Sequence, residues 1–300
     1  MGKTIFNLKT FALIIIGVVT VLSLAACGKS KPAEPLFALQ DFPVLDGSTA
    51  NMPLMAEVMS ETCGISLNDA QSQINCTTTP YAWLRLASRD ADILLVYEPA
   101  QATVDELQKT GIELTKVPIG RDGLVFIKNE SNPVNNLTLE QIQGIYSGKI
   151  TNWRQVGGED KPIVAYQRSE TSGSQALLLK LVMADTPLMK APTVLKPTEM
   201  GDLIDQLASY NNSGNAIGYS VYYYASQMYT QPGLKFIAVN GVEPSAKTIA
   251  DGSYPLLNDF YVAIRTDEPQ NSKTRQLMNW ILSDAGKQAL VKAGYVPVDR

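Results

Sequence analysis

The sequence contains no histidine. This absence excludes the Ser-His-Asp and Cys-His pairs of nucleophilic enzymes, histidine-ligated zinc sites and acid–base catalysis by an imidazole. A basic excess is also missing, because 25 Lys and Arg stand against 29 Asp and Glu and give a net charge of -4. Nucleic-acid-binding proteins normally carry such an excess, so the charge balance argues against a nucleic-acid partner.

Cysteine is scarce, with three in 300 residues. Cys63 and Cys76 are close enough in sequence to form a disulfide in an exported protein, because disulfides persist outside the cytoplasm. Two reduced, buried cysteines are the alternative, and the sequence leaves both open. Neither thiol has a histidine to activate it, so we do not expect a catalytic cysteine.

The third cysteine, Cys27, ends a segment that reads as an export signal. Lys3 and Lys9 precede the apolar residues 11–22, FALIIIGVVTVL, a run shorter than the roughly 20 residues that span a bilayer. The sequence Leu-Ala-Ala-Cys at residues 24–27 resembles the bacterial lipobox, whose cysteine is lipidated and becomes the first residue of the mature protein. A plain N-terminal membrane anchor is the alternative.

The remaining chain has ordinary globular composition, with 45% hydrophobic and 18% charged residues, and is long enough for two domains. Short apolar runs alternate with amphipathic stretches, which indicates an α/β fold with largely parallel sheets. The expected strands are residues 43–45, 92–97, 124–128, 163–166, 216–220, 234–239 and 260–264. The expected helices are residues 52–60, 80–88, 104–110, 139–146, 174–183, 200–210, 221–229 and 272–282.

Three predicted helices begin directly after hydroxyl-bearing residues. These residues are Ser48 with Thr49, Thr79 as an N-cap ahead of Pro80, and Ser172 with Ser174. The free N–H groups and partial positive charge of a helix start favour an anion. Gly173 would let the backbone approach a ligand closely, and Arg168 adds a planar, permanently charged fork that suits an oxyanion. Each feature alone is typical of ordinary capping or of a surface arginine, and spacing leaves open whether they meet.

The most specific stretch runs from residue 137 to residue 174. It contains Gly-Lys-Ile-x-x-Trp followed by Arg-x-x-x-Ser-Gly-Ser, and AIGYS follows at residues 216–220. From about residue 42 to residue 298 the chain resembles the phosphate-binding receptors of high-affinity phosphate ABC transporters, within the type II periplasmic-binding-protein superfamily. The resemblance implies a two-lobed α/β fold, each lobe a mixed sheet flanked by helices, with the ligand in the cleft between the lobes.

The resemblance also implies roles for individual residues. Arg168 matches the family's phosphate-clamping arginine. The remaining matches are Ser172, Gly173 and Ser174 to a Ser-Gly-Thr helix start, Ser48 and Thr49 to an N-terminal threonine loop, and Thr79 to a family serine. The family's proton-accepting aspartate has no direct counterpart, because Tyr97 stands at its position. Glu98, one residue later, is the carboxylate expected to bind the ligand instead.

The resemblance further implies the domain organisation. We expect a lipoprotein signal peptide at residues 1–26, a linker at 27–37, one lobe from residues 38–121 with 256–300, and the other from residues 122–255. The lobes would connect near Gly120–Gly123 and Gly252–Asn258. These connections would absorb a hinge motion, with an ordinary tight turn as the alternative at Gly120–Gly123.

The implied function is an extracytoplasmic substrate-binding lipoprotein, anchored through Cys27 to the outer face of the cell membrane. It would capture inorganic phosphate and deliver it to an ABC transporter permease, as a monomer with no cofactor, metal or nucleic acid. A receptor or sensor of the same fold for another oxyanion or a phosphorylated small molecule is the alternative, motivated by Tyr97 and Glu98. A hydrolase or phosphatase fits less well, because no G-x-S-x-G motif or metal-ligand cluster is present, and a structural lipoprotein or adhesin is the remaining alternative.

Overall fold

The computed structural model describes residues 34–209 and 214–298. The chain divides into two compact units, Met1–Glu34 and Pro35–Arg300, and the fold below is that of the second unit. Cys27, the predicted signal peptide 1–26 and residues 27–33 of the predicted linker lie outside the described residues. Within the described ranges, no helix combines the length and the apolar character needed to cross a bilayer.

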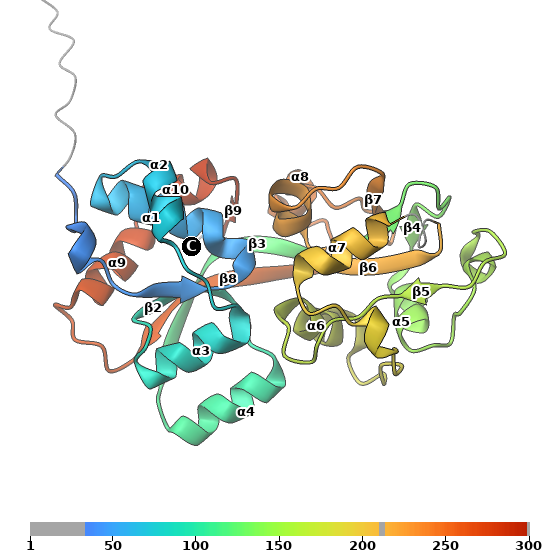
Figure 1. Ribbon diagram of the computed structural model, residues 1–300, viewed down its shortest axis with the longest axis horizontal. Helices are drawn as coiled ribbons and strands as arrows, with labels where there is room; N and C mark the ends of the chain where they lie inside the picture. The colour runs from blue at the N-terminus through green and yellow to red at the C-terminus, as the bar shows by residue number, and fades with distance from the viewer. Residues whose placement is uncertain (1–33, 210–213, 299–300) are drawn as a thin grey trace, which may run out of the picture. The chain divides into compact units, whose positions relative to one another are not determined.

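A mixed sheet forms the centre of the second unit (Figure 1). Its main path runs, in spatial order, through β1 (Leu45–Gly47), β2 (Ile93–Tyr97), β8 (Leu257–Arg265), β3 (Leu114–Asn129), β6 (Ala216–Val221) and β5 (Val164–Ala165). Off this path, β7 (Leu234–Val239) pairs with β3 and with β4 (Asn136–Leu137), and β9 (Val296–Pro297) pairs with β3. Every pair that includes β3 or β8 is antiparallel, whereas β1–β2, β5–β6 and β4–β7 are parallel. The expected α/β fold with a mixed sheet is confirmed, and the expectation of largely parallel sheets is wrong.

Strand β3 joins two parts of this sheet. Its residues 114–123 pair with β8, and its residues 124–129 pair with β6 and β7. The change of partner is marked by Leu124, whose N–H donates to the carbonyl of Leu256 at 2.8 Å. Figure 1 shows β3 and β8 running side by side between two groups of helices. We call the part around β1, β2 and β8 the first half and the part around β5, β6 and β7 the second half.

Helices flank the sheet in both halves (Figure 1). The α-helices of the first half are α1 (Met52–Cys63), α2 (Leu67–Gln73), α3 (Thr79–Ser88), α4 (Gln101–Thr110), α9 (Lys273–Ile281) and α10 (Asp284–Lys292). Those of the second half are α5 (Leu139–Tyr146), α6 (Gly173–Leu178), α7 (Met200–Ala208) and α8 (Ala246–Ala250). Two π-helical segments, Leu179–Met183 and Tyr224–Met228, follow α6 and β6.

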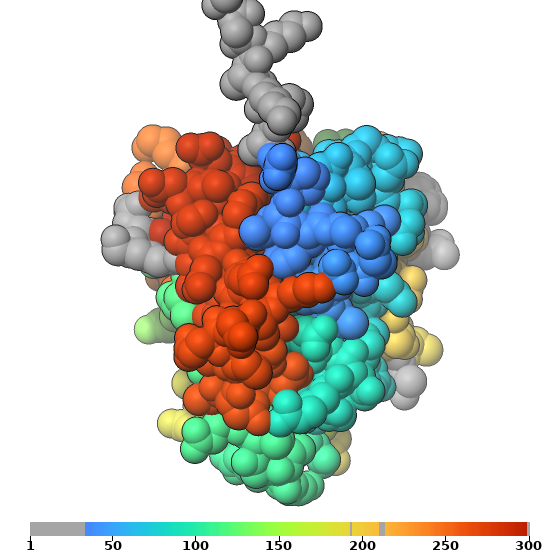
Figure 2. All heavy atoms as spheres, turned by 90° about the vertical axis from the view of Figure 1, so that its left-hand side faces the viewer, coloured from blue at the N-terminus to red at the C-terminus, as the bar shows by residue number. Residues whose placement is uncertain are grey.

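Stretches from both ends of the described chain build the first half. Lys292 Nζ lies 2.6 Å from a carboxylate oxygen of Glu57 and of Glu61, and Lys273 Nζ lies 2.7 Å from Asp41 Oδ1. Figure 2 shows the result on one face, where the early residues in blue lie directly against the late residues in orange and red. The first half is therefore assembled from two stretches that the second half separates in sequence.

An aromatic cluster links the core of the second half to the start of α6. Tyr219 packs against Tyr146 and Phe126 with ring centroids 5.5 and 6.3 Å away, and all three side chains are fully buried. The Tyr219 hydroxyl donates to the Gln175 side chain and accepts from the backbone N–H of Arg168 at 2.9 Å. Core packing thereby fixes the backbone at Arg168, because buried tyrosine hydroxyls need a hydrogen-bond partner.

The structure resolves the alternatives for the two cysteines of the folded unit. Cys63 and Cys76 are free thiols in the structure, so of the two open alternatives it has the reduced one, with Cys63 buried and Cys76 partly exposed. Cys63 is buried at the end of α1, whereas the Cys76 thiol donates to the carbonyl of Gly47 at 3.0 Å. Burial raises the pKa of both thiols, and that of Cys76 rises to about 11.

Candidate functional site

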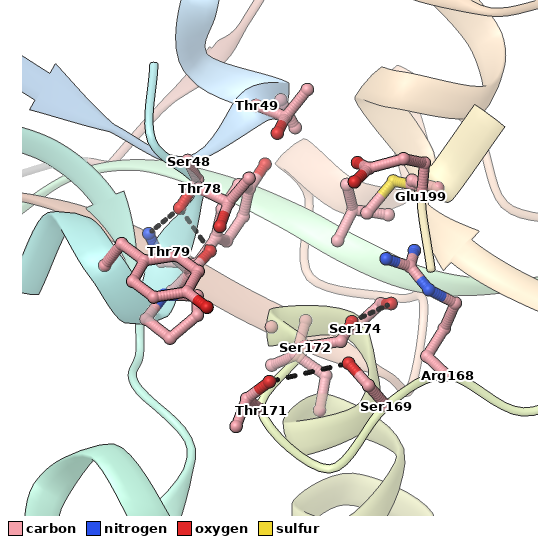
Figure 3. A pocket seen from close by; sticks show the side chains of 18 of the residues that line it. Ser48, Thr49, Thr78, Thr79, Arg168, Ser169, Thr171, Ser172, Ser174 and Glu199 are labelled. Carbon is pink, nitrogen blue, oxygen red and sulfur yellow. Dashed lines mark hydrogen bonds between the residues drawn. The ribbon is translucent and has the colours of Figure 1, made fainter. Parts of the chain in front are cut away.

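One pocket brings the predicted site residues of the two halves together (Figure 3). The first half contributes residues 48–50, 77–81 and Tyr97. The second half contributes residues 168–169, 171–174, 177, 198–200 and 221. Of the predicted ligand-binding residues, Ser48, Thr49, Thr79, Arg168, Ser172, Gly173 and Ser174 line this pocket. Hydroxyl groups dominate its polar surface, and Arg168 provides its positive charge.

On the first-half wall, Ser48 is the junction between three segments. Its hydroxyl lies 2.7 Å from Thr79 Oγ1 and accepts from the backbone N–H of Tyr97 at 3.0 Å. Ser48 follows β1, Thr79 begins α3 and Tyr97 ends β2, so one buried hydroxyl ties together the segments that form this wall. The wall is thus held in place before any ligand binds.

Helix α3 begins one residue earlier than predicted. Thr79 is its first residue and Thr78 is the N-cap, so the expected N-cap at Thr79 is wrong by one position. Thr78 has φ 73° and ψ 162°, a conformation that strains a β-branched residue. Pro80, the second residue of α3, loses no hydrogen bond there, because the first N–H groups of a helix have no partner within it. Thr79 lines the pocket at this helix start.

The second-half wall is formed by the loop that leads into α6. Ser172 is the N-cap of α6, and its hydroxyl lies 3.1 Å from the hydroxyl of Ser174. Both serines are buried, and the first backbone N–H groups of the helix have no partner within it. Hydroxyls and N–H groups are donors to an anion, so this wall repeats the chemistry of the opposite one.

Arg168 is a buried cation with unused hydrogen-bonding capacity. Its side chain is 7% exposed, and Nη2 donates to the carbonyl of Thr198 at 2.6 Å. Nε and Nη1 have no hydrogen-bond partner in the described part of the chain. Burial lowers the pKa of this guanidinium, yet an arginine stays charged in proteins. A buried, unpaired charge costs several kcal/mol, so the Arg168 fork is built for an anionic partner that enters the pocket.

Glu98, the carboxylate expected to bind the ligand, does not line the pocket. It forms an ion pair with Lys116. Burial alone would raise the pKa of Glu98, but hydrogen bonds from Lys116 and Tyr261 lower it below its ordinary value. The structure therefore corrects the predicted role: neighbouring residues of an extended segment point in opposite directions, and with Tyr97 toward the pocket Glu98 points away.

Tyr97 lines the pocket but directs its hydroxyl to a buried acid. The hydroxyl donates to Asp122 Oδ2 at 2.7 Å, and Asp122 also accepts from the backbone N–H groups of Gly123 and Tyr223. Burial raises the pKa of Asp122 to about 6, although these hydrogen bonds oppose the rise. Asp122 lies on β3 where the sheet changes partner, so it connects a strand end of the first half with the segment after β6.

Sequence reasoning missed the carboxylate that does line the pocket, Glu199. It precedes α7, directly after the Thr198 carbonyl that holds Arg168. Ser169, Thr171 and Met200 also line the pocket without having been predicted. An acidic residue before a predicted helix is a common cap, so the sequence carried no signal for its place beside Arg168.

The described residues contain no metal-binding cluster. Neither residues 34–209 nor residues 214–298 hold a group of three Asp, Glu or Cys side chains placed to bind a metal ion. The pocket encloses about 230 Å³. Drug-sized ligands usually occupy roughly 300–1,000 Å³, so its size favours a small anion over a large organic compound.

The chain belongs to the PBP superfamily, because the family described as "PBP superfamily domain" matches residues 44–285. Among curated relatives, Protein SphX of Synechococcus elongatus is 26% identical over 93% of this chain and 84% of that protein. Phosphate-binding protein PstS of Staphylococcus aureus is 25% identical over 92% of this chain and 84% of that protein. A match to Phosphate-binding protein PstS of Staphylococcus saprophyticus, 29% identical, covers 65% of this chain and 61% of that protein.

Solved structures agree with this fold. An ABC-type phosphate transport receptor from Vibrio cholerae superimposes with a TM-score of 0.61 at 25% identity, over 84% of this chain and 98% of that one. A high affinity periplasmic phosphate-binding protein (PfluDING) bound with phosphate gives a TM-score of 0.63 at 17% identity, over 86% of this chain and 90% of that one. At this identity the second match supports the fold alone.

Proposed function

We propose that this protein is an extracytoplasmic substrate-binding protein that captures inorganic phosphate in the pocket and delivers it to an ABC transporter permease. The observation that carries the proposal is Arg168, whose buried guanidinium leaves Nε and Nη1 unpaired beside a pocket lined with hydroxyl groups. The names of the relatives support phosphate as the anion. The protein binds its ligand and returns it unchanged, so no catalytic residue is needed.

The donor set is strong enough for tight binding. A hydrogen bond to a charged group contributes about 1.5–3 kcal/mol, and micromolar affinity needs about 8 kcal/mol. Arg168 offers two unused donors, and Ser48, Thr79, Ser172 and Ser174 add hydroxyls on both walls. A handful of these contacts exceeds the requirement after the cost of ordering the ligand and the side chains is subtracted.

We further propose that the two halves act as lobes that close on the anion. The proposed lobes are residues 38–121 with 256–300, and residues 122–255. Support comes from β3 and β8, which run between the halves, and from the change of partner near Gly123. Each half supplies one wall of the pocket, so an anion bound to both walls stabilises the closed arrangement.

The cellular part of the proposal depends on the N-terminal segment. Lipidation of Cys27 after removal of residues 1–26 would anchor a monomer to the outer face of the membrane, with residues 27–37 as the tether. The same fold could serve as a receptor or sensor for another oxyanion or a phosphorylated small molecule. The replacement of a carboxylate by Tyr97 at the pocket favours this second candidate, and the small pocket volume favours phosphate.

Isothermal titration of ligand-stripped protein with phosphate, sulfate, arsenate and a small organophosphate tests the proposal. Phosphate should bind with micromolar or better affinity and more tightly than sulfate or the organophosphate. Arg168→Ala should weaken phosphate binding roughly tenfold or more, because at least one charge-assisted bond is lost. Arg154→Ala is the matched control, since Arg154 lies on the surface in an ion pair with Asp160. No phosphate binding by the unmodified protein, or equal effects of both variants, would refute the proposal.

A further inference from the structure

Glu199 is the acidic side chain that lines the pocket within the described residues. Figure 3 shows its carboxylate directed into the pocket, between Arg168 on its own wall and Thr49 on the opposite wall. The preceding carbonyl, that of Thr198, accepts from Arg168 Nη2 at 2.6 Å. On the other side, at the start of α7, the backbone N–H of Glu199 donates to Asp202 Oδ2 at 3.3 Å. Glu199 is thus held at the pocket from both directions.

A carboxylate in an anion site has two possible effects. It repels an anion that has no proton to share, because two negative charges a few ångströms apart oppose each other. It attracts an anion that carries an O–H, because an ionised carboxylate is an acceptor without donors. Phosphate carries at least one O–H near neutral pH, whereas sulfate of the same shape carries none.

The other polar groups of the pocket cannot make this distinction. A serine or threonine hydroxyl donates to a bare oxygen and accepts from an O–H equally well, because it rotates to suit its partner. The Arg168 fork only donates, so it favours both anions. Asp122 is buried behind Tyr97 and already accepts from the Tyr97 hydroxyl, and Glu98 is paired with Lys116 outside the pocket.

Building on the proposed function, we propose that Glu199 determines specificity: it accepts the O–H of bound phosphate and excludes sulfate. The ligand lies between the donors of Arg168 and the acceptor of Glu199, so the site distinguishes anions both by their charge and by whether they carry an O–H. Glu199 is exposed to solvent in this structure, which screens part of its charge. Its effect on selectivity is therefore moderate, roughly tenfold rather than the full cost of a buried unpaired charge.

The test compares phosphate and sulfate affinities of five proteins by isothermal titration at neutral pH: the unmodified protein and the variants Glu199→Gln, Glu199→Asp, Glu98→Gln and Glu140→Gln. In Glu199→Gln the preference for phosphate over sulfate should fall roughly tenfold or more, chiefly through tighter sulfate binding. Glu199→Asp keeps the charge on a shorter side chain and should still reject sulfate, even if it binds phosphate more weakly. Glu140→Gln makes the same substitution at an exposed residue in the first turn of α5 and should leave the preference unchanged.

Each outcome has a distinct meaning. Loss of preference in Glu199→Gln with retention in Glu199→Asp and Glu140→Gln supports the assignment. An unchanged preference in Glu199→Gln, or an equal gain for both anions, overturns it while phosphate binding by the unmodified protein leaves the proposed function intact. Loss of preference in Glu98→Gln instead would assign the role to Glu98. An unmodified protein that binds no phosphate would overturn the proposed function and this inference together.

Discussion

Gly173 at the start of α6 faces Thr79 at the start of α3, and a methyl group on its Cα would come within 3.0 Å of Thr79 Oγ1. The two residues belong to different halves, so this is a point where the pocket walls meet. A Cβ contact this short requires the neighbour to move. The missing side chain of Gly173 therefore sets how closely the two walls can approach.

Gly173→Ala should weaken phosphate binding about tenfold, because the added methyl pushes Thr79 away from the pocket or holds the walls apart. Titration calorimetry measures the loss. In a Thr79→Ala background the same substitution should cost less, since the atom that it meets is gone, and the double-mutant cycle isolates this coupling. Additive losses in the cycle would show that the contact does not limit binding.

Ser48→Ala should lower both stability and phosphate affinity. Its hydroxyl accepts from the buried N–H of Tyr97 and contacts Thr79, so its removal leaves a donor unsatisfied and costs about 1–3 kcal/mol. Urea unfolding and calorimetry measure the two effects on one preparation. Ser88→Ala, at an exposed serine near the end of α3, is the control and should change neither quantity. A Ser48→Ala protein with unchanged unfolding free energy would contradict the junction described above.

Local signals predicted several elements well. The capping box of Thr138 and Gln141 predicts the helix that the structure has at Leu139–Tyr146, because its side chains satisfy backbone groups within the same turn. The sequence does not predict helices α2, α8 and α10, because they are short or largely polar and show weak periodicity. The predicted helix at residues 221–229 is largely confirmed, because residues 222–228 are helical, with a π-helix at Tyr224–Met228, and only its first residue, Val221, still belongs to β6.

The strand β3 shows why the middle of the fold was hard to predict. The sequence predicts a strand only at residues 124–128, but the strand begins at Leu114. Its first part contains Pro118, Gly120 and Asp122, which disfavour strands when judged locally. Pairing with β8 over this stretch stabilises it nonetheless, and such pairing depends on residues far away in sequence.

The residues of the candidate site also differ in whether neighbouring or distant parts of the sequence determine their positions. Ser48, Thr79 and Ser172 were found because each stands at a helix start, a feature visible in a few neighbouring residues. The prediction that Glu98 binds the ligand is wrong because adjacent residues of an extended segment point to opposite sides. A shift of one position at the end of the strand therefore reverses the direction of the side chain. Glu199 was missed because its position follows from the contact of Thr198 with Arg168, thirty residues away in sequence.

Asp122 should make stability depend on pH. Burial raises the pKa of its carboxyl from 3.8 to about 6 in the folded protein. The folded state then binds more protons than the unfolded state between these values, so stability falls as pH rises from about 4 to about 6. Above about pH 6 the loss of folding stability reaches about 3 kcal/mol, because each unit of pKa shift corresponds to 1.36 kcal/mol.

Asp122→Asn removes this titration and keeps an oxygen for the Tyr97 hydroxyl. Urea unfolding of both proteins from pH 4 to pH 7 measures the effect. The unfolding free energy of the variant minus that of the unmodified protein should increase as pH rises, by up to about 3 kcal/mol. Asp185→Asn, at an exposed aspartate, is the control. A difference that stays constant with pH would show that Asp122 does not titrate in this range.

The two thiols should differ between the folded and the unfolded protein. Cys76 is held by a hydrogen bond to Gly47, and burial raises its pKa to about 11. At pH 8 its thiolate fraction is then about two orders of magnitude below that of a free cysteine, so alkylation of the native protein at Cys76 should be slower by a similar factor. A protein carrying Cys27→Ser, unfolded in guanidinium without reductant, should present both Cys63 and Cys76 to iodoacetamide, as peptide mass mapping can show. If neither cysteine is labelled without reductant and both are labelled after reduction, Cys63 and Cys76 form a disulfide. That result would contradict the free thiols of the structure.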